Sequence, residues 1–319
     1  MVLGTLDDAL LSRKITLAMS PLGMATKPGK WHNLEMTVGQ LVNMLSHHRV
    51  GDKDGQSICQ GSVIGGQRKS ASVKENHILM LDIDTGADQE RLMARIKELG
   101  LFAVVWTTYN HLKPVTSIKK DQILRWARID REPTLDECLR YLREEKRYES
   151  WVLEGAELLE QEHTSDGINV RVKHKPMPKL RVLFVLEKAF NFATRAVSQK
   201  KAIDEWKGRY AGVSVLLGAA VDRACVDPAR LMFTPRHPGG AQGWGITVIP
   251  GKCLDIDTVA PAAFEKRGGA SAPADAFDAA LVANGIKQPS KGEFQTPWLK
   301  RWLARYAETF DAEGFFRDY

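Results

Sequence analysis

The sequence has few cysteines and no long apolar run, and both absences exclude classes of protein. Its four cysteines, Cys59, Cys138, Cys225 and Cys253, lie far apart in 319 residues and form no CxxC pair. Neither a zinc ribbon nor a disulfide framework is indicated, and a reducing compartment fits. No stretch approaches the roughly 20 apolar residues of a bilayer crossing, and no basic-then-apolar leader opens the chain. We therefore expect a soluble, cytoplasmic protein without a membrane partner.

The chain also lacks a strong charge of one sign. Its 45 Lys and Arg against 39 Asp and Glu give a formal net charge of +6. This modest excess permits a polyanionic partner such as nucleic acid, but charge alone does not establish one. The length and the 44% hydrophobic share suffice for one large or two modest domains, each with a core.

Two predicted strands with a helix between them occupy residues 77–108. HILMLDID, residues 77–84, is short, continuous and apolar, which predicts a buried strand. Residues 87–99 carry leucine and isoleucine at helical spacing, and Gly100 supplies a helix stop. LFAVVWTT, residues 101–108, predicts the second strand.

A charged segment, residues 117–170, then breaks the alternation. It reads as a helical insertion, in which Thr134 is an expected N-cap and Glu137 completes a capping box. We expect it to contact a template or a partner, or else to brace the sheet.

After the insertion, a third strand is predicted at residues 178–190, a helix within residues 194–209 and a fourth strand around residues 231–234. The order strand, helix, strand, insertion, strand, helix, strand is the split βαβ pattern of ferredoxin-like and RNA-recognition (RRM-like) folds. We therefore predict an α+β core, an antiparallel sheet with helices on one face, with additional N- and C-terminal elements.

The two ends of the chain carry weaker signals. The first 76 residues contain an amphipathic helix, TVGQLVNMLSHHRV, and a polar Gly-rich stretch, residues 51–76, expected to be a surface loop. GSVIGG within it lacks the GK[ST] ending of a phosphate loop. Residues 266–276 resemble a linker, and residues 277–319 are expected to form a small helical segment. The final RDY carries no helix stop signal, so the chain could be part of a longer protein.

Two acids, Asp82 and Asp84, stand at the C-terminal end of the first predicted strand. Residues i and i+2 of a strand point to the same face, so the pair could bind a divalent cation. Alone the signal is weak, since acidic pairs at strand ends are often only solvated. The letters LDIDT recur at residues 254–258 without an apolar strand before them. There we expect Asp257 and Thr258 to cap a short helix.

Further polar residues are expected at the ends of the neighbouring strands. His111 follows the second strand, Arg181 lies in the third, and Asp222 and Arg230 precede the fourth. Two-metal phosphoryl transfer needs carboxylates that hold cations about 3.5–4 Å apart and cationic groups for the phosphates. Taken singly, His111 would more often be a packing or surface residue and Arg181 a solvated or salt-bridged one. Together and in this order they favour a phosphoryl-transfer site.

The motifs HILMLDIDTG, VVWTTYNH, PKLRVLFVLE and AAVDRACVDPARLMFTPR resemble, in this order, those of the archaeo-eukaryotic primase superfamily, especially primase-polymerases of phages and plasmids. The resemblance covers roughly residues 70–240. It implies a site for two Mg²⁺ or Mn²⁺ ions whose ligands are Asp82, Asp84 and Asp222. The nucleotide contacts that it implies are His111, Arg181, Arg230 and, as a weaker candidate, Lys179.

The resemblance implies a DNA primase or primase-polymerase that makes primers on a single-stranded DNA template from ribo- or deoxynucleoside triphosphates. Residues 1–265 would form the catalytic domain, and a replicative helicase is a candidate partner. The motifs do not distinguish the two kinds of nucleotide, the start sequence or the length of extension. The chain departs from the family where Tyr109 replaces a small residue two positions before His111, with Thr108 as a candidate to take over its hydrogen bond. The insertion also has no zinc-binding cysteine cluster.

Three alternatives remain at the level of sequence. A haloacid-dehalogenase-like phosphatase also carries DxDx[TV] after a buried strand, but Gly86 stands where Thr or Val is required. A noncatalytic replication-associated nucleic-acid-binding module need not keep three acids. The third concerns Asp227, which could replace Asp222 as a metal ligand. Because Asp227 precedes Pro228, we expect it to cap a turn and favour Asp222.

Overall fold

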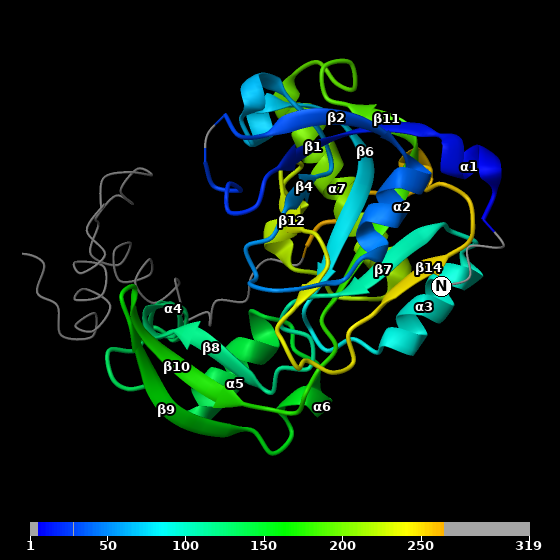
Figure 1. Ribbon diagram of the computed structural model, residues 1–319. Coiled ribbons are helices and arrows are strands. Elements are labelled where there is room, and N and C mark those ends of the chain that lie inside the picture. Colours follow the sequence, from blue (N-terminus) through cyan, green and yellow to red (C-terminus); the bar gives the residue numbers. More distant parts are fainter. Residues whose placement is uncertain (1–5, 28, 265–319) are drawn as a thin grey trace, which may run out of the picture. The chain divides into compact units, whose positions relative to one another are not determined.

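The computed structural model describes residues 6–27 and 29–264, all within the unit Met1–Arg267 (Figure 1). The predicted linker, residues 266–276, and the predicted helical segment, residues 277–319, lie outside the described residues. No helix in the described part is long and apolar enough to cross a membrane. The described residues form several mostly antiparallel sheets with helices, so the chain is a mixed α/β protein, compatible with the predicted α+β class.

A five-stranded sheet runs through the larger hydrophobic core in the order β14-β7-β11-β6-β5. Its strands are β5 (Gly61–Val63), β6 (Val73–Ile83), β7 (Ala103–Thr107), β11 (Leu180–Asn191) and β14 (Ile246–Ile249). Every neighbouring pair is antiparallel, so β6 and β7 run in the same direction with β11 between them. Helix α3 (Gln89–Glu98) connects β6 to β7, begins at its cap Asp88 and ends before Gly100, which has a φ of +63°. Three of the four predicted strands therefore lie here, with the predicted helix between the first two.

The fourth predicted strand belongs to another sheet. Strand β12 (Leu231–Phe233) pairs with β4 (Ser57–Cys59) in a sheet ordered β12-β4-β1-β2, with β1 (Lys14–Ser20) and β2 (His32–Thr37). The prediction that all four strands form one core sheet is therefore wrong for the fourth strand. Its place beside β6 is taken by β5, where a Cβ on Gly61 would lie 1.7 Å from the Glu75 carbonyl oxygen. Only glycine permits so close an approach of the two backbones.

The N-terminal region is more ordered than its polar composition indicates. Helices α1 (Asp8–Ser12) and α2 (Val38–Ser46) flank the strands of the second sheet in the chain, and Thr37 forms a capping box with Gln40 at the start of α2. The predicted surface loop, residues 51–76, instead contains β4, β5 and the start of β6, and β4 and β5 are fully buried. The expectation was wrong because small polar residues such as Ser57 and Ser62 occupy buried strand positions.

The insertion is a small α/β unit with a core of its own and is not purely helical. Strands β8 (Val115–Lys119), β9 (Glu157–Thr164) and β10 (Gly167–Lys173) form an antiparallel sheet in the order β8-β10-β9. Its helices are α4 (Lys120–Ala127), α5 (Leu135–Glu144), which has the predicted capping box, and α6 (Ser150–Leu153). Strand β9 is exposed along almost its whole length, so it lacks the apolar alternation by which a strand is recognised.

The remaining elements lead the chain back to the central sheet. Helix α7 (Gln199–Leu217) extends eight residues beyond the predicted end and stops at Gly218, which is left-handed. Two short strands, β3 (Arg49–Val50) and β13 (Arg236–His237), pair in parallel. The short 3-10 turns are η1 (Ile64–Gly66), η2 (Ser70–Ser72), η3 (Arg223–Val226) and η4 (Ile256–Thr258).

Candidate active site

The sheet register brings the first predicted acid and the first predicted cation together. Asp82 on β6 lies opposite Arg181 on β11, and Arg181 lies opposite Trp106 on β7. Side chains in one such row share a face of the sheet. Arg181 Nε is 3.4 Å from Asp82 Oδ1, and each side chain is 13% exposed. Arg181 Nη1 also donates to the Phe233 carbonyl oxygen at 2.8 Å, which fixes the guanidinium between β6 and β12.

The second acid has its own cation. Asp84 follows the end of β6, and its Oδ2 is 3.8 Å from Lys179 Nζ, which belongs to the residue before β11. The Lys179 side chain is 12% exposed, and its Nζ lies 5.8 Å from the centre of the Tyr148 ring. The nearby carboxylate of Asp84 raises the Lys179 pKa, although burial acts most strongly and in the opposite direction. Tyr148, which belongs to the insertion, therefore packs against this lysine of the candidate site.

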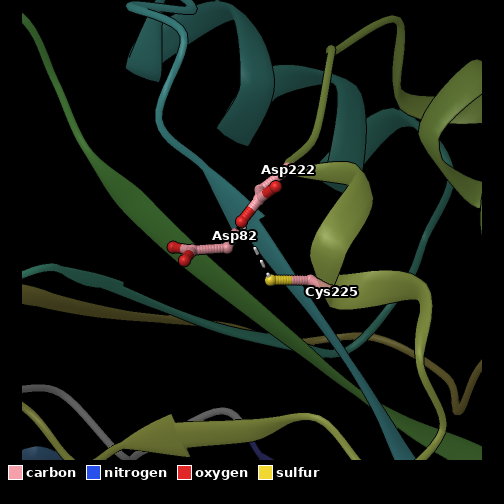
Figure 2. Close-up of side chains that lie close together, drawn as sticks. All are labelled: Asp82, Asp222 and Cys225. Atoms are coloured by element: carbon pink, nitrogen blue, oxygen red, sulfur yellow. Dashed lines mark hydrogen bonds between the residues drawn. The ribbon is translucent and has the colours of Figure 1, made fainter. Parts of the chain in front are cut away.

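Asp222 reaches the end of β6 from the loop after α7. Its backbone N–H donates to the Asp82 carbonyl oxygen at 2.8 Å, and its side chain caps η3 by accepting from Ala224 N at 2.9 Å. Figure 2 shows Asp222 and Cys225 on the turn beside Asp82, with the thiol directed at Asp222 Oδ2 at 3.7 Å. One ligand atom from each of Asp82, Asp222 and Cys225 lies within 4.8 Å of the others.

Arg230 completes the group of cations. Its Nη2 is 3.9 Å from Asp222 Oδ2, and its side chain is 39% exposed. Arg181, Lys179 and Arg230 therefore each stand within 4 Å of a different acid. Three carboxylates faced by three cations leave the group close to neutral when no other ion is bound.

Burial raises the pKa of Asp82 to about 6; Arg181 lowers it, while Asp84 and Asp222 raise it further. Asp82 Oδ1 and Asp84 Oδ1 are both buried without a hydrogen-bond donor. Buried carboxylate oxygens that lack donors, next to a third carboxylate, suit a divalent cation, because Mg²⁺ and Mn²⁺ prefer oxygen ligands. The residues present therefore fit a metal site. Burial also raises the pKa of Cys225, which keeps this thiol protonated beside the acids.

A cleft of about 470 Å³, partly open to solvent, lies in front of these residues. Asp82, Asp84 and Arg181 line it, together with residues 106–110 at the end of β7 and residues 233–236 after β12. Lys53 and Arg236 add two cations to this lining. Sequence reasoning missed both, because Lys53 lies in the supposed surface loop. The arginine of TPRHP directly after a strand was a signal for Arg236.

His111 is not among the residues that line the cleft. Its Nδ1 accepts a hydrogen bond from Lys179 N at 3.1 Å, and burial lowers its pKa. Tyr109 and Asn110 line the cleft, whereas His111, Lys179, Asp222 and Arg230 do not belong to its lining. The structure thus brings His111 to the backbone of Lys179, and a direct phosphate contact by His111 stays a prediction.

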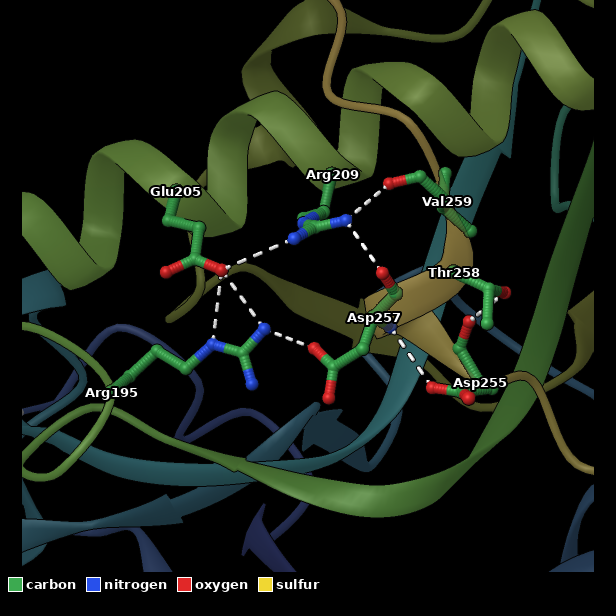
Figure 3. A network of polar contacts seen from close by, with 7 residues as sticks. All are labelled: Arg195, Glu205, Arg209, Asp255, Asp257, Thr258 and Val259. Atoms are coloured by element: carbon green, nitrogen blue, oxygen red, sulfur yellow. Dashed lines mark hydrogen bonds and ion pairs between the residues drawn. The ribbon is translucent and has the colours of Figure 1, made fainter.

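The second LDIDT sequence has a structural role, shown in Figure 3. Asp255 caps η4 by accepting from Asp257 N at 3.0 Å. The prediction that Asp257 and Thr258 form the cap is therefore wrong, because the capping residue is Asp255. Asp257 instead pairs with Arg195, which also pairs with Glu205 of α7 at 2.9 Å. The hydrogen bond from Arg195 lowers the Asp257 pKa.

Asp227 forms the turn that its sequence predicts. Its Oδ1 accepts from Ala229 N and from Ser70 Oγ, both at 2.8 Å. Both bonds are accepted by Oδ1, and the bond from Ala229 confirms the predicted turn cap.

Comparison with known proteins adds little to this geometry. No family model and no curated protein matches the chain. A solved structure of the AEP domain of the cyanophage S-2L primase-polymerase (PrimPol) is similar, with 12% identity and a TM-score of 0.31, over 79% of this chain and 94% of that one. So low a TM-score does not establish a shared fold, and the geometry of the site stands on its own.

Proposed function

We propose that the protein is a metal-dependent nucleotidyltransferase of the primase or primase-polymerase type, acting on single-stranded DNA with nucleoside triphosphates. One observation carries this proposal. Asp82 and Asp84, from one motif, and Asp222, from another, converge at one end of the central sheet. Each of these acids has a cation within 4 Å. Although these cations offset the formal charge, burial and the two neighbouring acids still raise the Asp82 pKa, which favours a bound metal cation at this carboxylate.

The residues that would hold two divalent ions are Asp82, Asp84 and Asp222. Bound there, Mg²⁺ or Mn²⁺ would neutralise phosphate charge and lower the pKa of the attacking hydroxyl. Cys225 is a poor ligand for a hard cation, and its contact with Asp222 Oδ2 supports a role in orienting that carboxylate.

The cations of the cleft would bind the triphosphate. Arg181 retains N–H donors beyond its bond to Phe233 and its pairing with Asp82, and Arg236 and Lys53 line the same cleft. In the proposed reaction a 3′-hydroxyl oxygen bonds to the α-phosphorus and loses its proton to solvent. The bond from that phosphorus to the bridging oxygen breaks, and pyrophosphate leaves. Groups that bind phosphate by charge suit this chemistry, because positioning and charge stabilisation account for most of its catalysis.

The test is synthesis on a single strand. We expect labelled products of increasing length when the protein is incubated with single-stranded DNA, Mn²⁺ or Mg²⁺ and labelled ATP or dATP. Asp82→Asn and Asp222→Asn should make none, and Asp255→Asn, a matched change in the second LDIDT copy, should make the normal amount. Absence of product from the unchanged protein across both metals and both nucleotides would refute the proposal.

The rival functions are less well supported. Strand β6 is antiparallel to both of its neighbours, whereas a haloacid-dehalogenase-like phosphatase needs a parallel sheet around its nucleophile. A noncatalytic nucleic-acid-binding module does not require carboxylate oxygens that are buried without a hydrogen-bond donor, as Asp82 Oδ1 and Asp84 Oδ1 are. Association with a replicative helicase and a role in phage or plasmid DNA replication stay predictions.

A further inference from the structure

Three aromatic rings form a stack beside the cleft. The rings of His237 and Trp244 lie 4.5 Å apart and nearly parallel, at 9°. The His48 ring lies 5.2 Å from each of them and packs against the stacked pair at a tilt of 42° to His237 and 40° to Trp244. His237 is buried, whereas Trp244 is 47% exposed. The stack therefore presents a large aromatic side chain to solvent on a rigid base of two imidazoles.

Hydrogen bonds fix this stack to the end of the central sheet. His48 Nε2 lies 3.1 Å from Thr107 Oγ1, and Gly245 N donates to the same oxygen at 3.0 Å. Gly243 packs so closely on the loop after β7 that a Cβ there would lie 2.8 Å from Leu112 Cδ1. The backbone that carries Trp244 is thus held on both sides.

The stack stands at the rim of the cleft and outside it. Thr107 and Arg236, the neighbours of His48 and His237, line the cleft, but none of the three stacked residues does. Trp244 precedes β14, and β14 is separated from β6 by β7 and β11. Three strand spacings put the start of β14 about 14 Å from the end of β6 that carries Asp82.

We propose that Trp244, supported by His237 and His48, stacks on a base of single-stranded DNA where the strand leaves the cleft. Every base has a π-face, so an exposed aromatic ring binds single strands with little sequence preference. A mononucleotide held at the acids would lie within the cleft, whereas a strand that passes through it continues across the rim. The choice of a DNA strand as the occupant rests on the proposed function, whereas the exposed ring of Trp244 on its base of imidazoles is a feature of the structure.

Cations and acids both lie near the stack. Arg49 and Arg236 face each other across the β3–β13 pair, and Lys53 lies in the next loop. Among the described residues none of these three forms an ion pair with an acid, but Asp52 and Asp54 share the loop with Lys53 and reduce its positive charge. We expect the part of the affinity that stacking on Trp244 supplies to depend only weakly on salt, in contrast to phosphate contacts with these cations.

The experiment measures binding without synthesis. Labelled oligothymidylate is titrated with the protein in EDTA, and anisotropy and tryptophan fluorescence are recorded together. Trp244→Ala should weaken binding about tenfold, and Trp244→Phe should retain most of the affinity while losing the quenching that the oligonucleotide causes. Val215→Ala, which shortens another exposed apolar side chain, on α7, should bind normally. The thermal unfolding of all variants is compared to show that they are folded.

The outcomes separate this inference from the proposed function. Normal binding by Trp244→Ala, or normal quenching in Trp244→Phe, would overturn the inference even if the protein synthesises primers. Equal quenching by dATP alone would assign the stack to a nucleotide base and also overturn it. Loss of binding in Trp244→Ala, with retention in Asp82→Asn, would support the stack even if no synthesis were found.

Discussion

The sequence LDIDT occurs twice in this chain, and the two copies adopt different secondary structures. In the first, residues 81–85, the acids sit at the end of a strand whose backbone groups bond to neighbouring strands. Their carboxylates are left without backbone donors. In the second, residues 254–258, the chain forms a 3-10 turn, and Asp255 is bonded to the backbone of its own turn. In these two copies, secondary structure thus decides whether the first acid bonds to its own backbone, although Asp222 caps η3 in the same way as Asp255 caps η4.

Their electrostatic surroundings differ in the same sense. Burial next to two further acids raises the pKa of Asp82 to about 6, and Arg181 compensates only in part. A hydrogen bond from Arg195 lowers the pKa of Asp257, which stands with a side chain 40% exposed. In the first copy, Asp82 is buried next to two further acids, and a bound cation would stabilise its charged form. In the second copy, Asp257 forms a partly exposed ion pair with Arg195.

The largest expected effect comes from breaking the first copy. Asp222→Ala removes the carboxylate that joins Asp82 at the end of β6, and we expect synthesis to fall at least about a hundredfold, because an underbound metal no longer stabilises the developing charge. The primer assay measures this, and circular dichroism shows whether the fold is kept. Full activity of Asp222→Ala together with an inactive Asp227→Ala would reverse the assignment of the third acid.

The second prediction concerns metal binding in the absence of any reaction. At a Mn²⁺ concentration 100 times its Kd, binding should stabilise the protein by about 2.7 kcal/mol, which corresponds to a rise in Tm of roughly 4–5 °C for a chain of this size. Asp82→Asn should lose this rise, and Asp257→Asn should keep it. Differential scanning calorimetry with and without Mn²⁺ provides the measurement. An equal rise in Asp82→Asn would move the metal site elsewhere.

A smaller effect is expected at the cation beside Asp222. Arg230→Ala should raise the apparent nucleotide KM roughly tenfold, since a charged hydrogen bond to phosphate is lost, with a smaller change in kcat. Initial rates at varied nucleotide concentration separate the two constants. Arg195→Ala, at the second copy, is the matched control and should leave KM unchanged.

The sequence predicted which strands carry the candidate site residues better than it predicted the fold around those strands. Strands β6, β7 and β11 were recognised because a short continuous apolar run indicates a buried strand. Asp82, Thr107 and Arg181 therefore lie on the strands that were predicted to carry them. Of the described strands, only β6, β7, β11 and β12 were predicted, and β4 and β9 are two of those that were missed. The first is only three residues long and buried throughout, and the second is exposed along almost its whole length. Neither has the alternation that sequence reasoning depends on.

The remaining residues of the cleft and its rim could not be predicted for a different reason. Lys53 and Arg236 of the cleft, and Trp244 at its rim, are placed by the pairing of β3 with β13 and of β14 with β7. These are contacts between segments almost 200 or 140 residues apart, and no local pattern encodes them. The position of β12 depends on β5, which fills the edge of β6 only because Gly61 allows it. Long-range competition for a strand edge decides such a placement.

The smallest expected effects are those of the two turn-forming acids, and they sharpen the comparison most. Asp227→Ala should cost roughly 1 kcal/mol of unfolding free energy through its lost cap. Asp257→Asn should cost less than about 1 kcal/mol, because its ion pair with Arg195 is partly exposed to solvent. Both variants should retain synthesis, since Asp227 bonds to Ala229 and Ser70 and Asp257 pairs with Arg195, and neither lines the cleft that Asp82 and Asp84 line. Urea unfolding gives the free energies, and the primer assay gives the activity. A loss of synthesis in Asp257→Asn without a loss of stability would mean that the second LDIDT copy acts in the reaction, and that the contrast between strand end and turn does not separate a ligand from a cap.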